Sequence, residues 1–198
     1  RYAKQIIRIN ALITIPLFLG LGILADPIIR VLLTERWIMA VPIMQVLCVA
    51  RLITLLCSIN VNILYIIGRT DLALRQQYLK IVIRVILVVA SIKFGIIYIA
   101  LAELLSTSIH YFINSYYPGK LMQYGAIKQI KDIFPFFIAG FVMALIVFLT
   151  TFFLDDSVLK LIVGPAVGIP SYLIMIKLLK IKELKYLIQK LKEFKIKS

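Results

Sequence analysis

The feature that most constrains this chain is a series of long apolar runs, several of them close to the length that crosses a bilayer. A transmembrane helix needs about 20 predominantly apolar residues, because lipid offers no hydrogen-bond partner to an exposed backbone. Hydrophobic residues make up 62% of the 198 positions, above the roughly 45–50% of soluble domains. We therefore expect an all-α, multi-pass membrane protein. Six candidate spans cover 9–25, 38–67, 81–92, 95–114, 134–154 and 158–176.

Two of the six spans depart from the ideal length. The third is short, and it becomes long enough only if its helix starts near Leu72 and includes Arg75, Lys80 and Arg84. The second has about 30 residues, so it must tilt or protrude from the bilayer. Residues that break helices mark predicted connections at 26–27, 68–71, 118–119 and 155–156.

The basic residues are distributed unevenly between the two sides that six spans create. With the first segment in the cytoplasm, 17 Lys and Arg fall in cytoplasmic segments and four in external ones. The external four are Arg30, Arg36, Lys93 and Lys160. Since cytoplasmic loops are enriched in Lys and Arg, this asymmetry predicts an even number of spans with both ends in the cytoplasm. It also explains most of the net charge of +14 without nucleic acid as a partner.

We divide the chain into a six-span bundle over 1–180 and a basic amphipathic tail helix over 181–198. The apolar residues of the tail share one helical face, with lysines around the other. They are Ile181, Leu184, Leu187, Ile188, Leu191 and Phe194. Such a helix is expected to lie on the inner leaflet, where anionic lipid attracts each lysine by roughly 1 kcal/mol. A solvated tail that only sets the topology is the alternative.

Polar residues inside three of the spans form narrow stripes, at about 100° of rotation per helical residue. In the second span the stripe is Arg51, Thr54, Ser58 and Asn62. In the fourth it is Glu103, Thr107, His110 and Asn114. In the third, Gln77, Lys80, Arg84 and Ser91 share a side. An ionisable residue at a helix centre costs about 2.5–3.5 kcal/mol on insertion scales, so each needs a structural or functional reason.

Two interpretations of these stripes stay open. In the first, the stripes of the second and fourth spans bind substrate in a water-filled cavity, with Arg51 and Arg84 contacting an anionic group. In the second, Ser, Thr and Asn bond across helices, Arg84 reaches the cytoplasmic headgroups, and Glu103 pairs with Arg51. His110 fits a packing role better than that of a ligand or proton relay.

Patterns that would support enzymatic chemistry or a cofactor are missing from the sequence. With one His and no Cys pair at ligand spacing, there is no zinc motif, and neither a Walker loop nor a dinucleotide Gly motif occurs. Cys48 and Cys57 lie on opposite sides of one helix, so they cannot form a disulfide. We expect neither an enzyme nor a bound metal or cofactor.

Short stretches spread over nearly the whole chain carry a family resemblance. They are PLFLGLGILADPII at 16–29, LTERW at 33–37, LC at 47–48, GRTDL at 68–72, NSYYPGKL at 114–121 and QIKDIFP at 129–135. Together they resemble the C-terminal half of Wzx-type polysaccharide flippases, in the multidrug/oligosaccharidyl-lipid/polysaccharide (MOP) superfamily. The resemblance implies two lobes around a central cavity. This chain would supply about the last six of fourteen spans, and an N-terminal lobe of the same longer protein would supply the rest.

The resemblance also implies a function and a location. Such proteins move an undecaprenyl-diphosphate-linked oligosaccharide, such as an O-antigen unit, across the bacterial cytoplasmic membrane by alternating access. Each negative charge moved outward against an inside-negative potential gains about 2.3 kcal/mol per 100 mV, so nucleotide hydrolysis is not required. One alternative is a cation-coupled multidrug exporter in which Glu103 binds the ion. Another is a non-transporting membrane scaffold whose tail recruits a partner.

Overall fold

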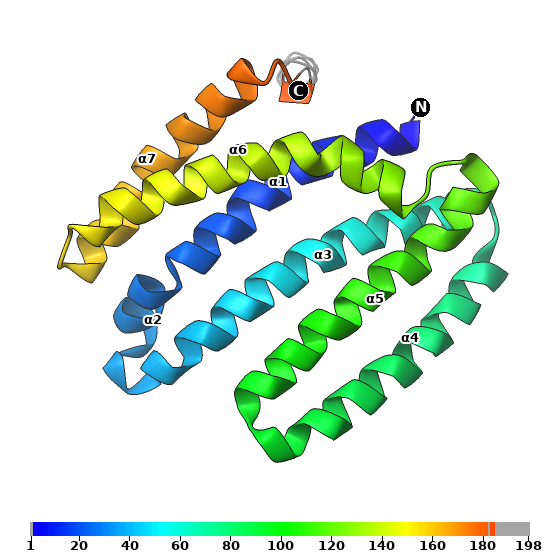
Figure 1. The fold of residues 1–198 in the computed structure, drawn as a ribbon, viewed down its shortest axis with the longest axis horizontal. Coiled ribbons are helices and arrows are strands. Elements are labelled where there is room, and N and C mark those ends of the chain that lie inside the picture. Colours follow the sequence, from blue (N-terminus) through cyan, green and yellow to red (C-terminus); the bar gives the residue numbers. More distant parts are fainter. Residues whose placement is uncertain (1, 182, 185–198) are drawn as a thin grey trace, which may run out of the picture.

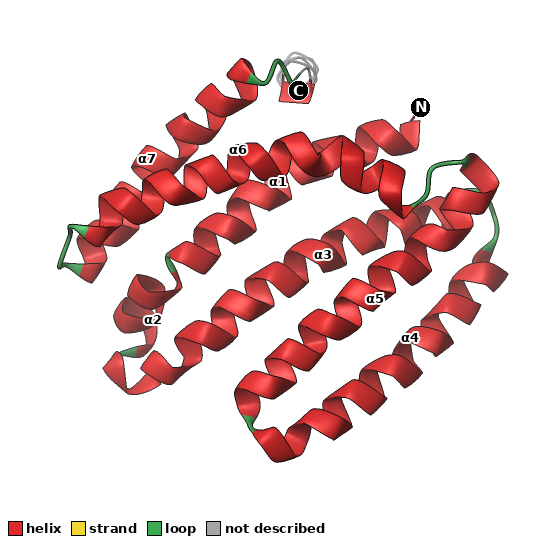
Figure 2. Ribbon diagram, in the orientation of Figure 1, coloured by secondary structure: helices red, strands yellow, loops and turns green. Residues whose placement is uncertain are grey.

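The computed structural model describes residues 2–181, 183 and 184, and the regular structure of this part is helical throughout (Figure 1, Figure 2). The elements are α1 (Tyr2–Ile23), α2 (Ala25–Leu33), η1 (Glu35–Ala40), α3 (Val41–Ile66), α4 (Thr70–Ser91), η2 (Ile92–Phe94), α5 (Ile96–Met122), α6 (Ala126–Phe152) and α7 (Ser157–Leu178). The all-α prediction is confirmed for these residues. The predicted tail helix lies outside the described residues, apart from Ile181, Glu183 and Leu184.

Five segments of the described chain are long and apolar enough to cross a membrane. They are Ala3–Ile23, Glu35–Ile66, Ile96–Met122, Ala126–Phe152 and Ser157–Leu178. The remaining predicted span corresponds to α4, which begins at Thr70 and includes Arg75, Lys80 and Arg84, as its length required. These basic residues exclude α4 from the apolar set, so length and composition identify five candidate crossings among the described residues, and the predicted count of six is not confirmed. Large apolar side chains remain exposed along the helices, as in a protein surrounded by lipid.

Neighbouring helices follow one another in space in the order α4, α5, α3, α1, α6 and α7 (Figure 1). The helices α3 and α5 run in the same direction, and α4 runs antiparallel to α5 beside it. One end of the bundle collects the start of α1, the turns at 67–69 and 123–125, and the end of α7 (Figure 1). We call it the terminal end. Its segments are those that the charge distribution predicts to be cytoplasmic.

Two of the predicted connections are helical instead. Asp26 and Pro27 lie in the first turn of α2, where proline is tolerated because that turn leaves its N–H groups unbonded. Pro118 lies inside α5, which continues until Gln123 adopts a left-handed conformation. Proline is more frequent inside membrane helices than in soluble ones, since neighbouring groups can satisfy the freed carbonyl. The predicted turn at Gly68 is confirmed, with a φ of 76° that glycine adopts without steric cost.

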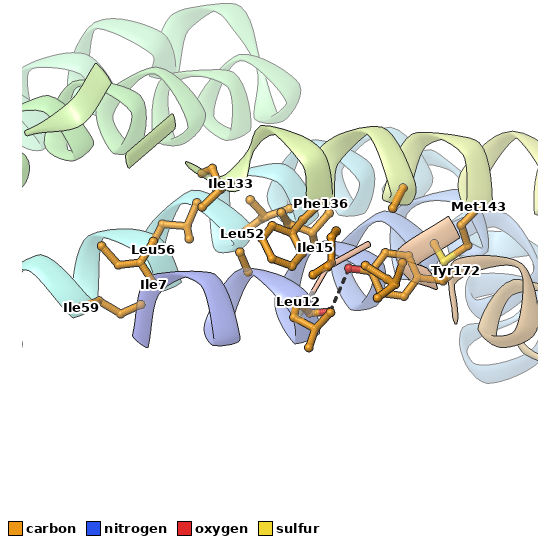
Figure 3. Close-up of a cluster of buried hydrophobic side chains, with 14 of the residues drawn as sticks. Ile7, Leu12, Ile15, Leu52, Leu56, Ile59, Ile133, Phe136, Met143 and Tyr172 are labelled. Carbon is orange, nitrogen blue, oxygen red and sulfur yellow. Dashed lines mark hydrogen bonds between the residues drawn. The ribbon is translucent and has the colours of Figure 1, made fainter. Parts of the chain in front are cut away.

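The main buried core lies where α1, α3, α6 and α7 meet (Figure 3). Ile15, Phe136 and Ile176 are fully buried there. Tyr172 of α7 donates a hydrogen bond to the backbone oxygen of Leu12 in α1 over 3.0 Å (Figure 3). Because lipid tails are as apolar as these side chains, close packing and such interhelical hydrogen bonds hold the helices together.

Glycines allow the closest approaches between these helices. A Cβ at Gly140 of α6 would lie 2.8 Å from Cγ2 of Ile15 and 2.8 Å from Cδ1 of Leu19, both on α1. A Cβ at Gly168 of α7 would lie 3.0 Å from Cγ2 of Val147 on α6. Small residues at these crossings therefore set how α1, α6 and α7 are rotated against one another.

Candidate functional site

A groove of about 270 Å³, which we call the polar groove, lies between α3, α4 and α5. Its lining is Thr54, Cys57, Ser58, Val61, Gln77, Lys80, Ile81, Arg84, Val85, Thr107, His110 and Asn114. Six of the nine predicted substrate residues are among them, namely Thr54, Ser58, Arg84, Thr107, His110 and Asn114. The tertiary structure thus brings the polar stripes of three helices to one place.

An ion pair between α4 and α5 joins Arg84 to one further predicted residue, Glu103. The Nη2 atom of Arg84 lies 2.9 Å from Oε1 of Glu103, with the side chains 46% and 20% exposed. Arg84 is 14 residues from the start of α4, about 21 Å along the helix from the terminal end. Glu103 thus pairs with Arg84, and the predicted pairing of Glu103 with Arg51 is wrong.

Arg51 and Asn62 lie outside the lining of the polar groove. Both side chains are exposed on α3. Arg51 forms no ion pair with any residue that the structure describes. Contact of these two residues with a substrate stays a prediction, and the groove assembles without them.

The hydroxyl groups of the polar groove bond to their own helices. Thr54, Ser58 and Thr107 each donate to a backbone oxygen three or four residues earlier, over 2.7–2.9 Å. This bonding satisfies the hydroxyl hydrogen within the helix and leaves oxygen lone pairs as acceptors. Among the described residues, these three hydroxyls do not form the cross-helix bonds that the packing interpretation expected.

Two buried residues of α5 complete the groove. Nε2 of His110 lies 3.1 Å from both the backbone oxygen of Lys80 and Oγ of Ser106, contacts that match a packing role. Asn114 is 2% exposed, and its Oδ1 has no hydrogen-bond partner within the described residues. Since buried polar atoms are rarely left unpaired, this oxygen is suited to accept a bond from a donor in the groove.

The charged lining of the polar groove is positive. Lys80 and Arg84 carry it, and the ion pair with Glu103 balances one of the two charges. Gln77 and Lys80 share the side of Arg84 on α4, but the sequence did not single them out as substrate contacts. Basic side chains together with hydroxyl and amide groups favour a phosphate or diphosphate as the ligand class.

A buried amide pair between α3 and α6 was not predicted from the sequence. Asn60 Nδ2 donates to Gln129 Oε1 over 3.0 Å, and Gln129 Nε2 donates back to Asn60 Oδ1 over 2.7 Å. The hydroxyl of Tyr111 donates to Gln129 Oε1 over 3.3 Å, and Gln129 Nε2 donates to the backbone oxygen of Tyr124 over 3.0 Å. The amide pair therefore joins α3, α5 and α6. The available signal was that Asn60 lies about 180° from Arg51 on α3, on its packing face.

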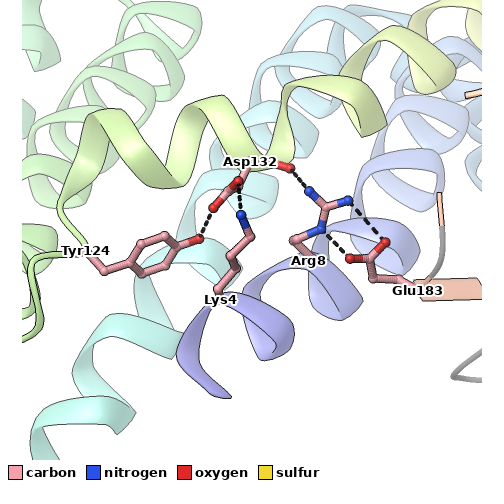
Figure 4. Close-up of polar contacts among 5 residues, drawn as sticks. All are labelled: Lys4, Arg8, Tyr124, Asp132 and Glu183. Atoms are coloured by element: carbon pink, nitrogen blue, oxygen red, sulfur yellow. Dashed lines mark hydrogen bonds and ion pairs between the residues drawn. The ribbon is translucent and has the colours of Figure 1, made fainter. Parts of the chain in front are cut away.

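A network of charged residues at the terminal end was also not predicted from the sequence (Figure 4). Asp132 of α6 accepts from Lys4 Nζ at 2.6 Å and from the Tyr124 hydroxyl at 2.9 Å. Arg8 of α1 binds both carboxylate oxygens of Glu183 and donates to the backbone oxygen of Asp132 over 3.1 Å. These contacts tie α1 and α6 to the segment that follows α7.

The network shifts the pKa of two groups that lie beyond the apolar helices. Burial raises the pKa of the Tyr124 phenol, and the hydrogen bond to Asp132 raises it further, so the phenol stays a donor. Burial also raises the pKa of Glu183, but the hydrogen bonds from Arg8 and its charge outweigh that effect and hold the pKa below its usual value. The carboxylate of Glu183 is therefore stabilised by its contact with α1.

Two curated proteins are similar to this chain. It is 38% identical over 63 residues to the teichuronic acid biosynthesis protein TuaB of Bacillus subtilis (strain 168), covering 32% of the chain and 13% of that protein. It is 23% identical over 172 residues to an uncharacterized membrane protein in the cps region of Klebsiella pneumoniae, covering 83% of the chain and 36% of that protein. The matched regions thus span 13% of the length of the first relative and 36% of the second.

No protein-family profile matches the chain, and no solved structure matches it significantly. With its apolar helices and a membrane protein among its relatives, the chain is a multi-pass membrane protein.

Proposed function

We propose that this chain belongs to a membrane protein of bacterial polysaccharide biosynthesis that moves an undecaprenyl-diphosphate-linked oligosaccharide from the inner to the outer leaflet by alternating access. The observation that carries the proposal is the polar groove, a basic and hydroxyl-lined site between α3, α4 and α5. The names of the relatives support the pathway, since one is a teichuronic acid biosynthesis protein and the other is a membrane protein of a cps region.

In this proposed function α4 is a sixth membrane crossing. The six crossing helices then form most of the second lobe of a MOP-type transporter. Because α3 and α5 run in parallel, the chain must return across the bilayer between them (Figure 1). The 22 residues of α4 are about 33 Å long, close to the hydrocarbon thickness of a bilayer. Lys80 and Arg84 line the groove, as ionisable residues of membrane helices usually face a cavity. An even number of crossings would put both ends of the chain on the same side, and the excess of Lys and Arg in these segments favours the cytoplasm.

The size of the groove supports a two-lobed cavity. Its volume of about 270 Å³ is below the roughly 300–1,000 Å³ of sites that enclose a drug-sized ligand. It therefore fits one wall of a larger cavity, with the other lobe as the opposite wall. In this arrangement Lys80 and Arg84 bind the diphosphate, and Thr54, Ser58 and Asn114 accept hydrogen bonds from the sugar. The lipid tail stays in the bilayer.

The test separates binding of the substrate from stabilisation of the bundle. The test uses the full-length protein in its bacterium. Arg84→Met should reduce surface polysaccharide by about 10- to 100-fold, the effect of one lost charge-assisted contact. The lipid-linked unit should accumulate inside the cell. The double variant Arg84→Met/Glu103→Met leaves no unpaired carboxylate and should stay defective. Arg75→Met is the matched control, because Arg75 is exposed on α4 but does not line the groove.

The outcomes of this test are distinct. Normal export by the double variant at equal membrane levels would show that Arg84 only serves the ion pair, and would refute its contact with the diphosphate. Glu103→Gln keeps Arg84 in the groove and should retain export. Under a cation-coupled multidrug exporter, the same change would instead abolish efflux.

A further inference from the structure

A second cavity, of about 410 Å³, lies at the terminal end where α1 meets the turn between α5 and α6. We call it the lysine pocket. Its charged lining is Lys4 of α1 and Lys128, Lys131 and Asp132 of α6, and Met122 contributes apolar surface. Because the candidate membrane helix α5 ends and α6 begins beside this cavity, we expect it to lie at the level of the lipid headgroups.

The contacts inside the lysine pocket leave it with uncompensated positive charge. Asp132 is already bonded to Lys4 at 2.6 Å and to the Tyr124 hydroxyl at 2.9 Å (Figure 4). Lys128 Nζ donates over 2.9 Å to a backbone oxygen of the α5–α6 turn, which carries no charge. Lys131 forms no ion pair with any residue that the structure describes. Two ammonium groups in the lining thus have no carboxylate partner there.

We propose that the lysine pocket binds the phosphate group of an anionic phospholipid, at a site separate from the basic tail. Lys128 and Lys131 are three residues apart on α6, so their Cβ atoms are about 5–6 Å apart and their ammonium groups can reach one phosphate. Lys4 and Tyr124 occupy the carboxylate of Asp132 and keep it from neutralising them. Basic pockets between membrane helices are suited to anionic headgroups.

The surroundings of the pocket favour a lipid over a free phosphate ion. Met122 and Ala3 add apolar surface beside the lysines, which suits the glycerol and the first methylenes of a lipid. The pocket also lies at the edge of the bilayer, where anionic headgroups are concentrated. A soluble ion gains nothing from either feature.

The experiment measures lipid binding by the intact protein purified in a nonionic detergent. Dioctanoyl phosphatidylglycerol is titrated, and bound lipid is counted by native mass spectrometry. Lys128→Gln/Lys131→Gln should bind this lipid about 25-fold more weakly, roughly fivefold for each lysine. The matched control Lys177→Gln/Lys180→Gln removes two charges at the same end of the bundle without touching the pocket, and should bind as the wild type does.

Three results would overturn the proposal. Equal losses in the pocket variant and the control would show attraction by general surface charge. Equal binding of dioctanoyl phosphatidylcholine would show that the headgroup charge is irrelevant. Inorganic phosphate that displaces the lipid at equal concentration would assign the pocket to a soluble anion. Each variant is first checked for an unchanged melting temperature, and Lys128→Arg/Lys131→Arg should restore binding.

Discussion

The buried amide pair provides the sharpest prediction for the stability of the bundle. Gln129→Met keeps the length of the side chain but removes all four of its hydrogen bonds, two of them to Asn60. Interhelical hydrogen bonds in membrane proteins average about 0.6 kcal/mol, so four give a loss of about 2.4 kcal/mol in the free energy of unfolding. Asn60→Leu breaks two of the four, and should cost about 1.2 kcal/mol.

A double-mutant cycle tests whether these bonds act as one unit. The double variant Asn60→Leu/Gln129→Met loses the same four bonds as Gln129→Met alone, so its total loss should also be about 2.4 kcal/mol. The expected coupling is therefore about 1.2 kcal/mol, measured by reversible unfolding in mixed detergent micelles. Asn62→Leu is the matched control, since Asn62 is an exposed amide on the same helix. It should change stability by less than about 0.5 kcal/mol.

The result that would refute this reasoning is additivity. If the two single losses simply add in the double variant, to within about 0.5 kcal/mol, then Asn60 and Gln129 do not bond to each other in the membrane. A loss for Asn62→Leu equal to that of Asn60→Leu would show that burial of the amide is not the cause.

Two further predictions concern helix packing and pH. Gly140→Val should lower the free energy of unfolding by about 1–3 kcal/mol, because its side chain would collide with Ile15 and Leu19. Gly20→Val is its control, since a Cβ at Gly20 has no neighbour within 4 Å, and equal losses would exclude this steric cause. Burial raises the pKa of Glu183, but the contact with Arg8 of α1 holds that pKa below 4.5 overall. The contact should therefore stabilise the folded protein above about pH 4.5. Its stabilisation should be lost as the pH falls through the folded-state pKa. Glu183→Gln should be less stable at neutral pH and lose less on acidification in detergent melts, and parallel curves would contradict the assignment.

The helical class, the apolar spans and the polar stripes could all be read from residue order. Each depends on a local property, because apolar run length and rotation per residue are properties of one helix at a time. The start of α4 near Leu72 could be predicted for the same reason. The helix α2 and the continuation of α5 through Pro118 could not, since proline permits a helix in both settings once its surroundings satisfy the backbone.

The tertiary structure decided which polar stripes come into contact, because contact depends on how the helices are rotated and where they cross. Glu103 faces Arg84 rather than Arg51, and Asn60 meets Gln129 from 69 residues away. The lysine pocket likewise combines Lys4 with a helix that begins more than a hundred residues later. Such pairings arise from side-chain packing between helices, including the glycine contacts of α6 and α7. In lipid, where apolar surface alone gives helices little reason to associate, this packing selects the partners, and no periodicity within a single helix contains that information.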